Sequence, residues 1–328
     1  MSSRESEDAR WLAATAALAA RGRPLSRPNP AVAALIVRDG RVIARGWTQP
    51  GGRPHAEAVA LAAAGEAARG ATLYVSLEPC AHQSERGPAC ADLVSASGLG
   101  RVVIGCMDPD PRTSGAGLER IRAAGIEVDH LPSPACEASL AGYLTAKRLG
   151  RPQVTLKLAL SLDGCIARAD GESQWITGAE ARAHTHAMRA RADAILVGGG
   201  TLRADTPRLD VRLPGLEHRS PERWVLTRDE APQGWRALSS PQAIHQMEGV
   251  QYLFVEGGAH TATAFLAEGL VDRLLIYRAP ILVGGRPALL DFGLSSLADA
   301  HGKWRLAERR TLGSDTLEVY EAANPHGK

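Results

Sequence analysis

The sequence predicts two layered α/β domains, and three observations support this fold class. Short apolar segments typical of strands alternate with alanine-rich segments typical of helices along the whole chain. The length of 328 residues suits two domains of ordinary size. The alternation begins afresh after Gly150-Arg151-Pro152, so we expect one domain at 1–149 and another at 150–328.

Apolar runs and glycine positions predict the elements of the first half. Gly65 and Gly125 each follow an alanine-rich segment and are typical of helix C-termini, and Asp39-Gly40 is typical of a hairpin turn. The expected helices are 8–20, 55–64, 90–96 and 117–124, and the expected strands are 32–37, 42–44, 72–76 and 101–106.

The second half contains more strands than the first. A proline-bearing polar stretch at 207–221 predicts a long loop. The expected strands are 154–160, 165–168, 194–198, 250–255, 274–277 and 316–320, and the expected helices are 180–191 and 259–268.

The composition indicates a cytoplasmic protein. Lys+Arg 38 against Asp+Glu 36 gives a net charge of +2, which argues against a dedicated duplex-DNA binder, so no nucleic-acid partner is expected. No apolar run is long enough to span a membrane, and the polar N-terminus is unlike a signal peptide. Five cysteines, an odd number without disulfide spacing, suit a reducing compartment. A homo-oligomer remains open.

His55-Ala56-Glu57, Pro79-Cys80 and Cys90 together predict a catalytic zinc site. One imidazole and two thiolates leave the fourth position of a tetrahedral zinc ion open for water, whose pKa the metal lowers. Glu57 is then the group that moves protons. His-x-Glu followed by Pro-Cys is the signature of zinc nucleobase deaminases. The other three cysteines lack such a context and are interpreted as structural.

The second half lacks the Gly-x-Gly-x-x-Gly dinucleotide fingerprint but has two other glycine-rich turns after strands. Gly198-Gly199-Gly200 and Glu256-Gly257-Gly258 let the backbone approach a phosphate closely, and together they suggest a bound dinucleotide. Lys157 lies inside an apolar strand. From the pattern alone, it is either a solvated face residue or a functional group.

Several blocks of the chain resemble the bifunctional deaminase/reductase family of riboflavin biosynthesis. The resemblance covers both halves, and its blocks are Pro28-Asn29-Pro30, 51–57, 78–90, 108–111, 157–164, 171–177, 193–198, 201–209 and 255–258.

This resemblance implies a cytidine-deaminase-like three-layer α/β/α domain followed by a dihydrofolate-reductase-like α/β domain. It implies one Zn²⁺ per chain and NADPH as cofactors. The implied first reaction is hydrolytic deamination of 2,5-diamino-6-(5-phosphoribosylamino)pyrimidin-4(3H)-one at C2. The implied second reaction is reduction of the ribosyl group of 5-amino-6-(5-phosphoribosylamino)uracil to ribityl.

The resemblance also assigns residues by position. In the first half the zinc ligands are His55, Cys80 and Cys90, with Glu57 catalytic. The substrate contacts there are Asn29, His82 and Arg86. In the second half Lys157 or Asp205 is the proton partner. The cofactor contacts are Ala159, Trp175, Thr201, Asp205 and Gly258, and the substrate contacts are Ser173, Arg189, Leu209, Arg212 and Glu256.

The chain departs from the family pattern at five places, one of which is Gly87-Pro88-Ala89 directly before the second zinc cysteine. The two zinc cysteines are ten positions apart, one more than usual, and Thr48 replaces a substrate-contacting histidine. Ala33 replaces a glycine, and Thr227-Arg228 replaces an Asp-Ser pair. Three alternatives therefore remain: a nucleic-acid or free-nucleobase zinc deaminase, a non-catalytic zinc module, and an enzyme with only one active half.

Overall fold

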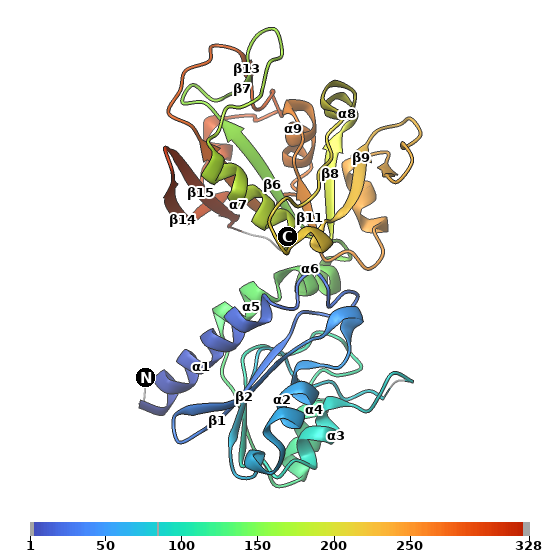
Figure 1. Cartoon of the computed structure of the whole chain (residues 1–328), viewed down its shortest axis with the longest axis vertical. Coiled ribbons are helices and arrows are strands. Elements are labelled where there is room, and N and C mark those ends of the chain that lie inside the picture. The colour runs from blue at the N-terminus through green and yellow to red at the C-terminus, as the bar shows by residue number, and fades with distance from the viewer. Residues whose placement is uncertain (1–2, 84, 324–328) are drawn as a thin grey trace. The chain divides into compact units, whose positions relative to one another are not determined.

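The computed structural model describes residues 3–83 and 85–323, and the chain separates into two compact units, Met1–Arg148 and Leu149–Lys328 (Figure 1). Each unit combines a β-sheet with helices, which confirms the predicted α/β class. Among the helices of the described residues, none has both the length and the apolar character that crossing a membrane requires.

The first unit contains a five-stranded sheet in the order β2-β1-β3-β4-β5. β1 pairs antiparallel with β2 and β3, whereas β3, β4 and β5 run parallel. The strands are β1 (Ala33–Arg38), β2 (Arg41–Trp47), β3 (Thr72–Val75), β4 (Arg101–Ile104) and β5 (Glu127–His130).

Helices cover both faces of this sheet and make the three-layer arrangement. α1 packs on β1 and β3 and against α5, while α2 packs on β1 and β2 and against α3, which contacts α4 (Figure 1). The helices are α1 (Ser3–Ala19), α2 (Ala56–Ala64), α3 (Cys90–Ser95), α4 (Ala116–Ala123), α5 (Pro134–Ser139) and α6 (Ala141–Leu149), with 3₁₀ turns η1 (Pro50–Gly52) and η2 (Gly65–Ala68).

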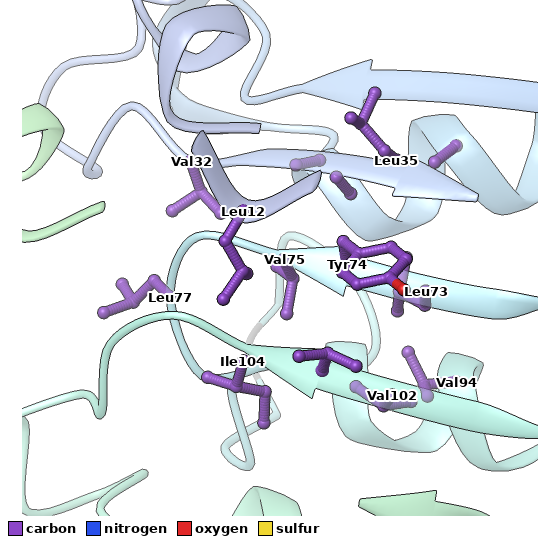
Figure 2. Packing of buried hydrophobic residues seen from close by; sticks show 14 of the residues in the cluster. Leu12, Val32, Leu35, Leu73, Tyr74, Val75, Leu77, Val94, Val102 and Ile104 are labelled. Atoms are coloured by element: carbon purple, nitrogen blue, oxygen red, sulfur yellow. The ribbon is translucent and has the colours of Figure 1, made fainter. Parts of the chain in front are cut away.

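The central strands of the first unit are buried on both faces, which is why they form continuous apolar runs in the sequence rather than alternating ones. Figure 2 shows Leu12 of α1, Leu73 and Val75 of β3, and Val102 and Ile104 of β4, which all belong to one buried apolar cluster. All five side chains are fully buried. The sheet is therefore a rigid support for the loops that follow its strands.

The second unit contains an eight-stranded sheet in the order β10-β9-β8-β11-β6-β12-β15-β14. The first six strands in this order run parallel, and β15 and β14 are added antiparallel. The strands are β6 (Gln153–Leu160), β8 (Ala194–Gly198), β9 (Glu222–Leu226), β10 (Arg236–Leu238), β11 (Tyr252–Val255), β12 (Arg273–Arg278), β14 (Trp304–Leu312) and β15 (Asp315–Ala322), with a separate pair β7 (Cys165–Ala167) and β13 (Arg286–Pro287).

Two apolar cores lie on opposite faces of this sheet. Alternate residues of β6, including Leu156 and Leu158, join Phe265 of α9 in one core. Ala181 of α7 and Tyr277 of β12 belong to the other. The helices are α7 (Ala179–Arg189), α8 (Gly199–Asp205) and α9 (Ala259–Ala267), with 3₁₀ turns η3 (Glu217–Arg219), η4 (Pro241–Gln246) and η5 (Leu297–Ala300).

A buried ion pair fixes the start of β6. Arg151 donates to both carboxylate oxygens of Asp272, at 2.7 and 2.8 Å, and the Val154 backbone N–H donates to the same carboxylate at 2.7 Å. Both charged side chains are less than one-tenth exposed. The central strand is therefore held to the segment that begins β12.

Asp272→Asn should lower the free energy of unfolding of the second unit by about 3 kcal/mol, because it leaves the Arg151 charge buried without its counterion. Urea unfolding of the full chain measures this effect. Glu321→Gln is the matched control, since its partner Arg305 is two-thirds exposed. That exposed pair should contribute less than about 1 kcal/mol. Equal losses in the two variants would contradict this account of Asp272.

Candidate functional site

Three separate segments of the first unit bring His55, Cys80 and Cys90 together. His55 is the N-cap residue of α2, and Cys90 is the first residue of α3. Cys80 lies in the loop that follows β3. Their ligand atoms all lie within 4.8 Å of one another, and both cysteines are buried.

The spacing of these atoms suits a zinc ion. His55 Nδ1 lies 3.2 Å from Cys90 Sγ and 3.6 Å from Cys80 Sγ. In a tetrahedral site with Zn–N about 2.0 Å and Zn–S about 2.3 Å, an N···S edge is about 3.5 Å. The Cys90 backbone N–H donates to Cys80 Sγ at 3.3 Å, which stabilises negative charge on that sulfur. The three donors match a catalytic zinc site with one position left for water.

Glu57 lies in the first turn of α2 and is almost completely buried. Burial raises the pKa of its carboxyl group to about 7, although the neighbouring His55 opposes the shift. A carboxyl group buried beside a cluster of metal ligands is suited to taking up and releasing protons.

Asn29, predicted as a substrate contact, lies next to the zinc-ligand candidate His55. Its side-chain nitrogen is 3.0 Å from His55 Nε2 and donates to the Gly52 carbonyl at 3.0 Å. Gly52 has φ +87°, and a Cβ there would come within 2.7 Å of Asn29, so glycine is required at this contact. The asparagine therefore fixes the plane of the imidazole.

The loop between the two cysteines, which carries the unusual spacing, is tied back to the turn before His55. Arg86 donates to the Gly51 carbonyl at 2.5 Å, and Arg53 donates to the Pro88 carbonyl at 3.2 Å. His82 lies in the same loop, and among the described residues its buried Nδ1 has no hydrogen-bond partner. This loop therefore presents one unused polar atom near the zinc-ligand segment.

Thr48 takes a structural role. Its side chain is buried, and its hydroxyl accepts from the Val32 backbone N–H at 3.0 Å. Thr48, at the position where a histidine was expected from the family pattern, is therefore used here to join two backbone segments.

Glu78 is a supporting residue that the sequence reasoning did not single out. Its carboxylate accepts from the backbone N–H groups of Gly115, at 2.8 Å, and Asp108, at 3.3 Å. Gly117 packs so closely on Pro79 that a Cβ there would lie 2.2 Å from the Pro79 carbonyl oxygen. Glu78 therefore fastens the loop carrying Cys80 to the segment after β4. The sequence feature that could have pointed to Glu78 is its position directly before Pro79-Cys80.

The second unit contains a cavity of about 1330 Å³ at the carboxyl ends of its parallel strands. Ligands of open α/β sheets bind at this edge. Every residue predicted for the reductase half lines this cavity: Lys157, Ala159, Ser173, Trp175, Arg189, Thr201, Asp205, Leu209, Arg212, Glu256 and Gly258.

A buried ionic cluster forms the floor of this cavity. Arg189 donates to both oxygens of Glu256, at 2.6 and 2.9 Å, and to the Asp210 carbonyl at 3.0 Å. Burial opposes ionisation of Glu256, but Arg189 nevertheless lowers the pKa of this carboxyl group. Burial lowers the pKa of the Lys157 ammonium group, and the charges of Glu256 and Arg189 act on it in opposite directions. Arg189, predicted as a substrate contact, lines the cavity, and its guanidinium holds Glu256.

Trp175 and Leu209 lie at the walls of the cavity. Trp175 is 62% exposed, so it is not a core residue, and the Arg182 guanidinium lies 4.8 Å from the centre of its ring. Leu209 is buried with φ +55°, a conformation that costs energy in a residue with a Cβ. Such backbone strain is concentrated at functional sites.

Comparison with known proteins identifies both units. Residues 5–106 match the cytidine and deoxycytidylate deaminase zinc-binding region, and residues 152–317 match the RibD C-terminal domain. The riboflavin biosynthesis protein RibD of Escherichia coli is 37% identical, with 94% of this chain and 98% of that protein covered. The chain belongs to the RibD family.

Other RibD proteins are similar to this chain over nearly its whole length. RibD of Aquifex aeolicus is 35% identical, with 96% of this chain and 98% of that protein covered. The structure of Acinetobacter baumannii RibD, form 2, has a TM-score of 0.85 at 32% identity, covering 98% of this chain and 100% of that one. The deaminase/reductase of Thermotoga maritima has a TM-score of 0.87 at 30% identity, covering 97% and 99%.

Membership of the RibD family confirms the function predicted from the sequence. The chain is a bifunctional deaminase and reductase of riboflavin biosynthesis, and it combines a zinc-binding deaminase domain with a reductase domain of the NADPH-using RibD type. A non-catalytic zinc module and a deaminase with an idle second domain do not account for both matched regions.

Cys90→Ser should reduce the zinc content from about one ion per chain to well below it, because one of the three protein ligands is lost. Elemental analysis after dialysis against a mild chelator measures the metal. Cys165→Ser is the matched control, since Cys165 is buried in β7 of the other unit. Full zinc retention by the Cys90 variant would remove this cysteine from the ligand set.

Proposed function

We propose that residues 1–149 deaminate 2,5-diamino-6-(5-phosphoribosylamino)pyrimidin-4(3H)-one at C2 and that residues 150–328 reduce the ribosyl group of the product to ribityl. The observation that carries the proposal is the pairing of Glu57, buried beside the His55, Cys80 and Cys90 donors, with the cavity containing Lys157 in the same chain. The substrate assignment is supported by the Thermotoga maritima relative, which is described as a diaminohydroxyphosphoribosylaminopyrimidine deaminase and 5-amino-6-(5-phosphoribosylamino)uracil reductase.

In the first reaction, water replaces the C2 amino group and ammonia leaves, so a proton must move from the attacking water to the leaving nitrogen. A bound zinc ion supplies Lewis acidity that favours ionisation of this water. Glu57 carries the proton, because its carboxyl group is buried next to the ligands and is not itself a ligand.

The other predicted residues of the deaminase half orient the reactants. Asn29 holds the His55 imidazole through Nε2, so its primary role is positioning the ligand. His82 offers its unpartnered buried Nδ1 to the substrate. Arg86 holds the loop against the turn before His55 through the Gly51 carbonyl.

In the second reaction, C1′ of the ribosyl group gains a hydride and the C1′–O4′ bond breaks, so O4′ must gain a proton. NADPH supplies the hydride when it is bound in the cavity. Lys157 donates the proton, since it lines the cavity and its burial favours release of a proton. Glu256, held by Arg189, fixes the position of the substrate opposite this lysine. Asp205 is exposed at the rim and has a binding role.

Glu57→Gln should lower the rate of ammonia release by at least about 100-fold, because the amide cannot transfer a proton. Zinc content should remain unchanged. The variant should still oxidise NADPH when it is given 5-amino-6-(5-phosphoribosylamino)uracil directly. Ammonia release at the wild-type rate would exclude Glu57 as the proton carrier.

Lys157→Met should lower reductase turnover by about 100-fold without weakening NADP⁺ binding, because it removes a proton donor and not a cofactor contact. The wild-type rate should fall as pH rises through the lowered pKa of Lys157, since only the protonated amine can donate. A pH profile of NADPH oxidation with the deaminated substrate measures this decrease in rate. If the same decrease at high pH remained in the methionine variant, it would belong to a group other than Lys157.

A further inference from the structure

The NADPH cavity does not end at the residues considered so far. A second cavity of about 500 Å³ adjoins it at Gly199. Neither Lys157 nor Glu256 lines this second cavity, so it lies away from the reacting end. The two cavities share Gly199, Arg203, Thr206, Pro207, Arg208, Thr227 and Asp229. A dinucleotide with its nicotinamide near Lys157 would extend toward this side cavity.

The side cavity has the character of a nucleoside site. Leu202, Val225 and Trp235 give it apolar walls, and the Arg223 guanidinium lies 5.4 Å from the centre of the Trp235 ring. An aromatic ring and aliphatic side chains suit the flat face of an adenine. The adenosine end of the cofactor is the part that needs such walls.

Positive charge gathers where the two cavities meet. Arg203 of α8 and Arg228, which follows β9, both line the large cavity. Gly199 leaves the space between the two elements open, because a Cβ there would lie 3.2 Å from Arg203 Nη1 and 3.5 Å from Thr227 Oγ1. The Arg203 guanidinium and the Thr227 hydroxyl both lie close to Gly199, and the hydroxyl donates to Asp229 Oδ2 at 3.3 Å. The Arg203 guanidinium is therefore the cation nearest this glycine.

The acidic residue at this place engages Arg203 only weakly. Asp229 Oδ2 lies 3.8 Å from Arg203 Nη1, and both side chains are more than two-thirds exposed. Exposed pairs of this kind contribute little free energy. Arg228 has no hydrogen-bond or ion-pair partner among the described residues. Two arginines are thus available to a phosphate, which guanidinium groups bind with paired hydrogen bonds.

We propose that Arg203 and Arg228 bind the 2′-phosphate of NADPH and so select it over NADH. The two cofactors differ only in this phosphate. Asp229 opposes the phosphate and would accept a hydrogen bond from the free 2′-hydroxyl of NADH. The arginines must therefore outweigh Asp229, and they are the specificity-determining residues of the reductase. The proposal rests on this cavity being the NADPH site.

The test uses the zinc-loaded full chain and measures binding by calorimetry, without turnover. The probes are NADP⁺, 2′,5′-ADP and 5′-ADP, of which only the first two carry a 2′-phosphate. Arg203→Met and Arg228→Met should each weaken 2′,5′-ADP binding about tenfold and leave 5′-ADP binding unchanged. Asp229→Asn should strengthen 2′,5′-ADP binding. Arg305→Met, at an exposed arginine that lines neither cavity, is the matched control and should change nothing.

Each other outcome overturns a definite part of the proposal. Equal weakening of 2′,5′-ADP and 5′-ADP would place the arginines at the pyrophosphate and not at the 2′-phosphate. Unchanged binding of both probes in both arginine variants would remove the subsite. Failure of the wild-type chain to bind NADP⁺ would instead contradict the proposed reductase site, whatever the variants do.

Discussion

Parallel strands end at the same edge of a sheet, and both candidate sites of this enzyme depend on that geometry. In the first unit β3 and β4 run parallel, so the loop carrying Cys80 and the loop after β4 meet and are joined through Glu78. In the second unit β6, β8, β9 and β11 run parallel, so Ala159, Gly198, Thr227 and Glu256 open into one cavity. Residues far apart in the sequence become neighbours because the strands share a direction.

Both sites bury charge that the fold alone would not require. Placing ionisable groups away from water costs free energy unless partners compensate for it. Arg189 and Glu256 compensate each other with two hydrogen bonds, whereas Glu57 and Lys157 keep pKa values displaced by burial. Displaced pKa values of this kind are concentrated at active sites, where proton transfer requires them. Glu57 and Lys157, whose burial costs free energy, are therefore the residues to which we assign proton transfer.

The sequence predicted the donors of the first site because their chemistry is rare and their spacing is specific. It left Lys157 ambiguous, since alternation along a strand shows which residues share a face but not which face opens into a cavity. Glu78 and the side cavity near Gly199 depend on contacts between segments that no local pattern encodes. β14 was missed because most of its side chains are exposed, so it lacks the alternation typical of a half-buried strand.

Most departures from the family pattern lie in the deaminase half. The central claim is therefore that both halves are active and that the reductase acts on the product of the deaminase. The direct measurement supplies the purified, zinc-loaded chain with NADPH and only the diaminopyrimidine ribosyl phosphate, and follows ammonia and NADPH together. We expect ammonia release first and then one NADPH oxidised for each ammonia released. Ammonia without NADPH oxidation, or neither, would show that one half is inactive and would contradict the account.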